Sequence, residues 1–184
     1  VPASIEAGAN YNTAIGYLVM ENVEAGNGNT SVGMNAANDI TDSYASVYVG
    51  YAAGGFNTTG SRNVFVGYAA GASDIASDNV AVGVYAGYGM TGNSNVVVGS
   101  DAGYNATGTT GSIYIGKAAG RYTQGTYNVF IGEKAGSGAS SGLHTAYQNV
   151  GIGRESLMDV TSAAYNVAVG TYAGANLTTG VGNI

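Results

Sequence analysis

The sequence predicts an all-β fold, a parallel β-solenoid of about ten rungs with 16 or 17 residues each. One unit, clearest at 63–71, returns along the whole chain: Asn, β-branched residue, variable residue, β-branched residue, Gly, two variable residues, Ala, Gly. Its central glycines follow one another at 16 or 17 residues, with one interval of 21. Such short periods are typical of solenoids, whose units bury their apolar faces by stacking on one another. These glycines are Gly16, Gly33, Gly50, Gly67, Gly83, Gly99, Gly116, Gly132, Gly153 and Gly170.

Composition agrees with an ordered β fold. Of 184 residues, 45% are hydrophobic and only 9% are charged, which is too apolar for a disordered chain. No stretch approaches the roughly 20 apolar residues that a transmembrane helix needs, so we expect no membrane insertion within this segment. Cysteine is absent, which excludes disulfides and thiolate metal sites.

The formal net charge of −6 lies almost wholly in the first half of the chain. Residues 1–101 contain eight acidic side chains and a single basic one, Arg62. Phosphate binding requires a cluster of Lys and Arg, so we expect no nucleic-acid partner.

The repeats extend over 12–184, preceded by a lead-in or cap at 1–11 that contains the only proline, Pro2. The first two units have bulkier residues in place of Ala-Gly, as end units of solenoids commonly do. Asn183 begins what would be an eleventh unit, so we expect further repeats after Ile184.

Within a unit, the alternation of Val64, Phe65 and Val66 is typical of a short strand with one buried face. We expect the two valines to face the core and Phe65 to face outward. Gly67 then allows a turn, and a second short strand ends at Gly71. Each rung should therefore have two strands and two turns. The residue three after the motif glycine is small in nearly every rung, which predicts a thin core: Val19, Ala36, Ala53, Ala70, Ala86, Ala102, Ala119, Ala135, Ser156 and Ala173.

The first residue of the unit is polar in every rung, and we expect it to form a hydrogen-bonded ladder between rungs. This column is Asn12, Asn29, Ser46, Asn63, Asn79, Asn95, Ser112, Asn128, Asn149 and Asn166. The long interval of 21 places about four extra residues between Ser137 and Gln148. Insertions of this kind form loops that often carry function.

The variable residue between the two β-branched positions is apolar in most rungs. If it faced outward, it would form a stripe about 48 Å long, more than a soluble monomer usually exposes. We therefore expect copies of the chain to cover it around a rotation axis. The predicted interface residues are Tyr48, Phe65, Val97, Tyr114 and Phe130.

Repeats of Asn-[Val/Ile]-x-[Val/Ile]-Gly resemble the left-handed parallel β-roll of trimeric autotransporter adhesin heads, and also the stalk repeats of bacteriophage tail fibres and related bacterial surface fibres. The resemblance covers about 170 of the 184 residues. It implies a left-handed coil, a homotrimer, and an extracellular location on a virion tail fibre or a bacterial cell surface. The period here is two or three residues longer than in the best-known adhesin heads.

The titratable residues do not predict an enzyme. His144 is the only histidine and lies in the insertion, where an ordinary surface role is the expectation. Asp74 and Asp78 are close in sequence, but turns commonly contain Asp and a glycosidase pair needs a cleft. No calcium-turn or phosphate-loop signature occurs. We expect no catalytic residues, no metal and no cofactor.

The tyrosines are the remaining candidates for binding, since Tyr can stack on sugar rings and donate hydrogen bonds. A receptor-contact region is predicted at His144, Tyr147, Tyr122 and Tyr104, with a cell-surface glycan or protein as receptor. Tyr88 belongs to the same group. The competing interpretation is that these rings pack against neighbouring turns. Separately, Lys117, Glu133 and Arg154, with Lys134 and Glu155, predict a ladder of exposed ion pairs.

The sequence thus favours a structural and adhesive segment of an extracellular fibre, which holds or forms a receptor-binding surface. The alternative is an adhesin head that binds host glycan or matrix directly through its turns. An ice-binding solenoid would need a regular Thr-x-Thr array, and threonine pairs such as Thr58-Thr59 occupy no constant column. A depolymerising tailspike would need paired acids in a cleft.

Overall fold

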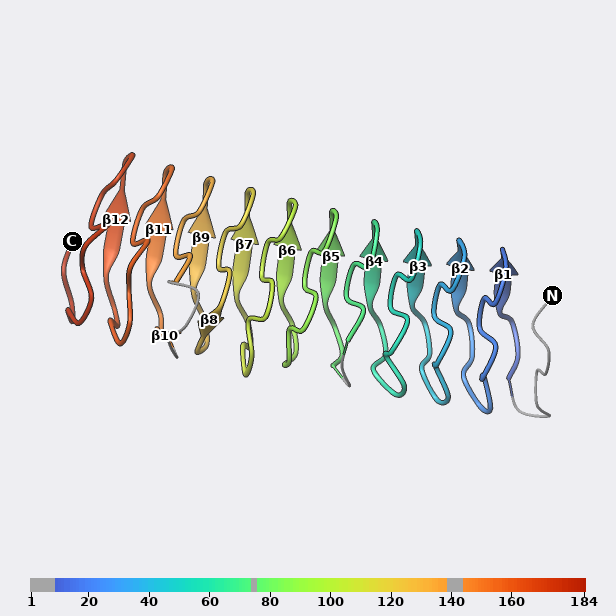
Figure 1. The fold of residues 1–184 in the computed structure, drawn as a ribbon. Helices are drawn as coiled ribbons and strands as arrows, with labels where there is room; N and C mark the ends of the chain where they lie inside the picture. Colours follow the sequence, from blue (N-terminus) through green and yellow to red (C-terminus); the bar gives the residue numbers. More distant parts are fainter. Residues whose placement is uncertain (1–8, 74–75, 139–143) are drawn as a thin grey trace.

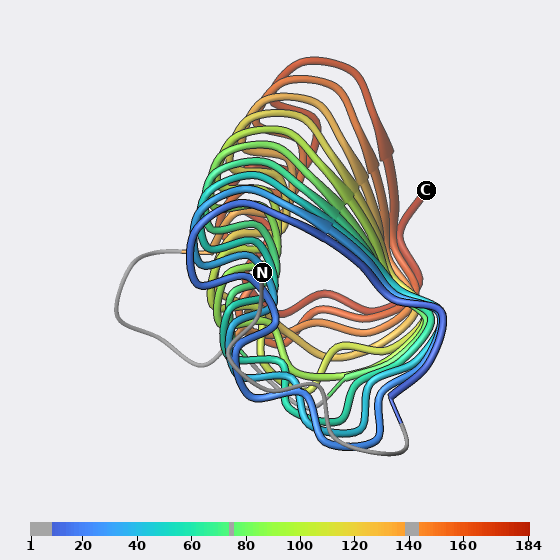
Figure 2. The same cartoon turned by 90° about the vertical axis from the view of Figure 1, so that its right-hand side faces the viewer.

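A computed structural model of the chain describes residues 9–73, 76–138 and 144–184. The chain forms a parallel β-solenoid without helices in its described part. Ten three-residue strands pair side by side in a single parallel sheet that runs the length of the molecule (Figure 1). Turned by 90°, the rungs appear as successive nested loops, each displaced slightly from the one before (Figure 2).

The order of strands in this sheet follows the sequence, and equivalent residues of successive units pair in register, as Phe65 does with Ala81. Two further strands of two residues each pair parallel with one another outside it. The main sheet consists of β1 (Thr13–Ile15), β2 (Thr30–Val32), β3 (Val47–Val49), β4 (Val64–Val66), β5 (Val80–Val82), β6 (Val96–Val98), β7 (Ile113–Ile115), β9 (Val129–Ile131), β11 (Val150–Ile152) and β12 (Val167–Val169). The short pair is β8 (Thr123–Gln124) and β10 (His144–Thr145).

The predicted second strand of each rung is wrong. After the motif glycine the chain continues through consecutive turns. Three columns of each rung lie in the left-handed region: two residues after this glycine, four residues after it, and just before the asparagine column. Ala69 (φ 50°), Gly71 (φ 56°) and Asp78 (φ 63°) are examples. Left-handed residues interrupt an extended chain, so the return path is a series of bends.

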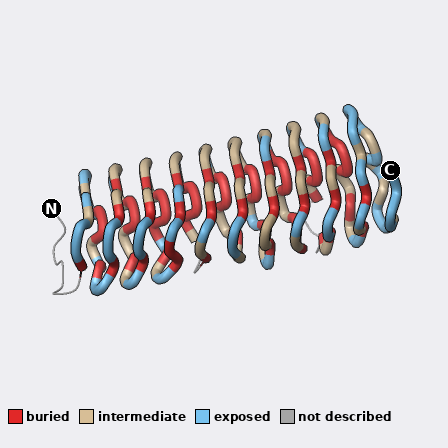
Figure 3. Tube along the Cα trace, turned by 180° about the vertical axis from the view of Figure 1, so that it is seen from behind, coloured by how far each residue is buried: buried red, intermediate tan, exposed pale blue. Residues whose placement is uncertain are grey.

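The predicted orientation of the strands is also wrong. The central residue of each strand faces the core of the single chain, and the two flanking β-branched residues face outward. Phe65 is only 4% exposed, whereas Val64 beside it is 37% exposed. The residues expected at a trimer interface are all buried within one chain: Tyr48, Phe65, Val97, Tyr114 and Phe130. Buried segments of successive rungs follow one another along the solenoid (Figure 3).

In several rungs, two core positions compensate in size: where one side chain is large, the other is small. Where the central strand residue is aromatic, the residue six positions later is glycine, as in Phe65 with Gly71; a Cβ on that glycine would collide with the ring. Where the central residue is Gly151, the later position is Leu157, which is fully buried. The first rung likewise combines Ala14 with the buried Met20. This exchange explains why its second segment departs from Ala-Gly.

The aromatic residues of the core also contact one another between rungs. Tyr48 meets Phe65 edge to face at 5.7 Å between ring centroids, and Tyr114 stacks on Phe130 at the same distance. The alanine column lies opposite the strands and is fully buried in the interior rungs, as at Ala86, which confirms the thin core.

The asparagine ladder is confirmed. From Asn29 to Asn183, each column residue donates its backbone N–H to the side-chain oxygen of the equivalent residue one rung earlier, at 2.8–3.2 Å. The side-chain amide of Asn95 also donates to the carbonyl oxygen of Thr109, at 3.0 Å. Buried amides are therefore paired from rung to rung, and they fix the register of the stack.

The two buried tyrosines, Tyr48 and Tyr114, differ in the hydrogen bonds of their hydroxyl groups. The Tyr48 hydroxyl bonds Ser43 and Asn57, each at 2.9 Å, whereas the Tyr114 hydroxyl has no hydrogen-bond partner. Burial raises the pKa of Tyr114 to about 12. We therefore expect Tyr114→Phe to be neutral or stabilising by about 1 kcal/mol near pH 7, and Tyr48→Phe to be destabilising by about 1 to 2 kcal/mol.

Alkaline pH should enlarge the difference between wild type and Tyr114→Phe. Above about pH 10 an unfolded tyrosine releases its proton while folded Tyr114 keeps it, so the free energy of unfolding falls as pH rises to about 12, by about 2 to 3 kcal/mol from this group. Denaturant unfolding of both proteins at pH 8 and pH 11 measures this. An equal loss of stability in both would show that Tyr114 is not the buried group described here.

Candidate interaction surfaces

The outer surface of the main sheet carries two parallel columns of β-branched side chains, which we call the aliphatic face. It consists of the first and third residue of each of the ten strands. Apart from Thr13 and Thr30, all of them are Val or Ile. All are partly or well exposed, with Val169 at 67%. At a rise of about 4.8 Å per rung, the face is about 48 Å long. Apolar surfaces of this extent are commonly interaction sites.

Six tyrosines form a second surface feature on the turns, which we call the tyrosine stripe: Tyr51, Tyr68, Tyr85, Tyr88, Tyr104 and Tyr122. Tyr51 stacks on Tyr68 at 5.0 Å between centroids, and each further ring contacts another of the set at 5.3–6.4 Å. The guanidinium of Arg121 lies over the rings of Tyr104 and Tyr122 at the end of the stripe. A hydrogen bond with Tyr68 raises the pKa of Tyr85. The stripe therefore adds side-chain contacts between five successive rungs.

The predicted receptor-contact residues do not form one site. Tyr104 and Tyr122 contact each other at 6.0 Å between centroids. Tyr147 is 44% exposed and belongs to another rung, where it forms a bridge with Ala164. His144 is only 2% exposed, so its expected surface position is wrong. Its Nδ1 lies 2.8 Å from the carbonyl oxygen of Val160.

Pairing between β8 and β10 accounts for the burial of His144, because it adds the end of the insertion to the stack opposite Thr123. The rest of the predicted insertion, 139–143, lies outside the described residues.

The predicted ladder of exposed ion pairs is confirmed between two rungs. Arg154 lies 3.8 Å from Glu133, and Lys134 lies 3.9 Å from Glu155. Arg154 also contacts its neighbour Glu155 at 3.0 Å. Because most of these side chains are largely exposed, each pair contributes only about 0 to 1 kcal/mol. Lys117 takes part in none of these ion pairs.

A separate ion pair links the fourth and fifth rungs. Arg62 donates to both carboxylate oxygens of Asp78, at 2.6 and 2.7 Å, and its guanidinium lies over the ring of Tyr44. The hydrogen bond from Arg62 lowers the pKa of Asp78. Asp78 is thus held as a paired carboxylate. Asp74, which is close to Asp78 in sequence, lies outside the described residues.

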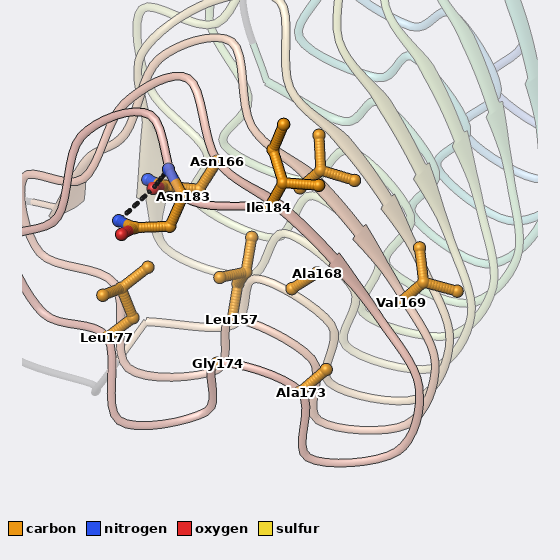
Figure 4. Close-up of a pocket in the computed structure, with 10 residues that line it drawn as sticks. Leu157, Asn166, Ala168, Val169, Ala173, Gly174, Leu177, Asn183 and Ile184 are labelled. Atoms are coloured by element: carbon orange, nitrogen blue, oxygen red, sulfur yellow. Dashed lines mark hydrogen bonds between the residues drawn. The ribbon is translucent and has the colours of Figure 1, made fainter.

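At the last rung, the interior of the solenoid opens into a cavity of about 420 Å³ (Figure 4). Leu157, Ala168 and Leu177 line it, together with the amides of Asn166 and Asn183. Asn183 donates its backbone N–H to Asn166 Oδ1 at 2.9 Å, so the ladder reaches this rim. Its lining residues occupy the same positions of the repeat that are covered by the next rung elsewhere in the solenoid.

Over 9–73, 76–138 and 144–184, no three His, Asp or Glu side chains gather so as to hold a metal ion. The same residues include no helix of the length and apolarity that crossing a bilayer requires. Comparison with protein families, with curated proteins and with solved structures gives no significant match. The class of protein is therefore defined by the fold alone, a parallel β-solenoid with an aliphatic face.

Proposed function

We propose that this chain is a structural and adhesive segment of an extracellular fibre, either a phage tail fibre or a bacterial surface fibre. The observation that carries the proposal is the aliphatic face, which continues over all ten strands without a charged residue. A long parallel sheet joined by backbone and asparagine hydrogen bonds makes a stiff rod. Such a rod holds a binding surface at a distance from its anchor, and it needs no catalysis, metal or cofactor.

The proposed assembly is a homotrimer whose three aliphatic faces meet on a common axis. The apolar side chains available for self-association are therefore the flanking residues of each strand, such as Val80 and Val82, and not the central ones. These side chains are half-buried in one chain and would be covered by two others. A closed rotational assembly covers the same face on every copy, whereas a monomer would leave about 48 Å of apolar surface in water.

A charge on the aliphatic face is expected to separate the copies. Val80→Glu would place a carboxylate in the middle of the proposed interface, where burial without a partner is costly. Val80→Thr is the matched control, since the first two rungs carry Thr13 and Thr30 in the same column. Sedimentation velocity should show trimers for wild type and Val80→Thr, and monomers for Val80→Glu. Unchanged association of a folded Val80→Glu protein would exclude this face as the interface.

Direct adhesion through the turns is the second candidate, and the tyrosine stripe is the observation that favours it. Between the third and seventh rungs, its tyrosines occupy different positions of the repeat. Tyr51 and Tyr68 directly follow the motif glycine, whereas Tyr104 and Tyr122 lie five and six residues after it. The equivalent positions of other rungs hold Met34, Ser100 or Ala175, so the repeat itself does not require tyrosine there.

A further inference from the structure

A groove opens on the turn side of the first three rungs, next to the tyrosine stripe. Its volume is about 420 Å³. Seven residues line it: Leu18, Asn35, Asn38, Tyr51, Ala52, Gly55 and Phe56. Gly55 carries no side chain where the equivalent residues of the neighbouring rungs are Asn38 and Ala72, which leaves the groove open at this rung.

The apolar wall of the groove is unusually exposed. Phe56 is 60% exposed and Tyr51 is 40% exposed, while Leu18 completes the wall from the first rung. Aromatic rings beside polar groups are the usual lining of small-ligand sites. The rings therefore provide a surface against which the apolar C–H face of a sugar can lie.

The polar wall contains a side-chain oxygen that the fold leaves without a partner. The side-chain oxygen Oδ1 of Asn35 is buried without a hydrogen-bond partner. The side chain of the neighbouring Asn38 is occupied, because its amide donates to the Leu18 carbonyl oxygen at 2.9 Å and to Glu21 at 3.1 Å. An unpaired buried polar group costs stability, so it calls for an explanation. Because the terminal torsion of asparagine is broad, rotation of the Asn35 amide can present a donor or an acceptor to the groove.

The charge around the groove selects the class of ligand. Glu21 bonds Asn38 in its lining, Asp39 follows in the same turn, and the first Lys or Arg of the chain is Arg62. Anionic ligands would meet only like charge, and an aliphatic ligand would leave the Asn35 amide unpaired. Sugar hydroxyls both donate and accept hydrogen bonds, and a neutral sugar ring has an apolar face.

From the aromatic wall, the unpartnered Oδ1 of Asn35 and the acidic side chains around the groove, we propose that this groove binds a neutral glycan chain. The proposal names a site and a ligand class for the adhesive part of the function proposed above. It does not depend on trimer formation, because the groove is complete within one chain.

Calorimetric titration with defined oligosaccharides tests the proposal, using maltohexaose and chitohexaose as neutral probes and trigalacturonate as the anionic one. Asn35→Ala removes the amide and keeps the backbone, because Ala52 and Ala69 occupy the same column with left-handed φ values of 52° and 50°. Phe56→Ser removes the aromatic wall and introduces the residue that the next rung carries, Ser73. Tyr127→Ser is the control, an equally exposed aromatic residue at 57% outside the groove.

We expect at least one neutral hexasaccharide to bind, and binding to weaken about tenfold in Asn35→Ala, as loss of one buried hydrogen bond implies. Phe56→Ser should weaken it at least as much, and Tyr127→Ser should leave it unchanged. Three results would overturn the proposal: no binding of either neutral probe at millimolar concentration, equal binding by wild type and both groove variants, or tighter binding of trigalacturonate. Light scattering on the same samples reports assembly separately, so a failure of the glycan site is distinguishable from a failure of the trimer.

Discussion

Gly67→Ala is expected to destabilise the solenoid by about 3 to 5 kcal/mol, adding backbone strain to overpacking. Gly67 has a φ of 140°, which residues with a side chain rarely adopt. A Cβ there would also lie 2.7 Å from the carbonyl carbon of Gly83 in the next rung. The rungs would have to separate at that point, and the backbone hydrogen bonds beside it would lengthen.

Gly108→Ala is the matched control for this substitution. Gly108 also has a positive φ, 67°, but no atom lies within 4 Å of the position its Cβ would take. Only the conformational cost should remain, about 1 to 2 kcal/mol. Urea unfolding followed by circular dichroism measures both. Equal losses for Gly67→Ala and Gly108→Ala would mean that close stacking of the motif glycines does not limit the spacing of rungs.

Phe130→Ala is expected to cost about 3 to 5 kcal/mol, because it removes a fully buried ring and leaves a cavity. The ring stacks on Tyr114 and packs against Gly136. Gly136 has no side chain that could fill the space left by the ring. The structure places this ring in the interior of one chain, so the loss should appear in the unfolding of the chain at any protein concentration.

Ile131→Ala, one residue further along the same strand, provides the comparison. Ile131 faces outward and is only half-buried. Its truncation should therefore change the association of copies more than the unfolding of one chain. Denaturation curves recorded over a range of protein concentrations separate the two effects. The opposite result, with Phe130→Ala acting on association and Ile131→Ala on unfolding, would restore the orientation expected from sequence.

The periodicity of the sequence predicted the parallel solenoid, the spacing of its rungs, the asparagine ladder and the small alanine column, because each of these repeats at a constant position. The orientation of the strands could not be predicted from alternation alone. Both faces of Val64–Val66 are apolar, so the pattern does not show which one is buried. The useful signal lay elsewhere in the rung, where Phe65 accompanies Gly71 and Gly151 accompanies Leu157. Such exchange of size requires both members to share one core.

Other features could not be predicted by comparing equivalent positions of the repeat, because each depends on local packing or pairing. Left-handed residues on the return path include Ala69, Asp101 and Lys134, which have no glycine-like signature. The tyrosine stripe crosses columns, so no single column contains it. Burial of His144 depends on pairing between β8 and β10, which the insertion makes irregular. The groove depends on how Gly55 packs beside its neighbours and on the unpartnered Oδ1 of Asn35, which only the packed structure shows.

Multi-angle light scattering of the wild-type chain is the most direct test of the central claim that copies associate through the aliphatic face. The account predicts a molar mass three times the 18.2 kDa of one chain, maintained on dilution to micromolar concentration. A monodisperse species of 18.2 kDa would contradict it, since the Val and Ile columns of all ten strands would then face water.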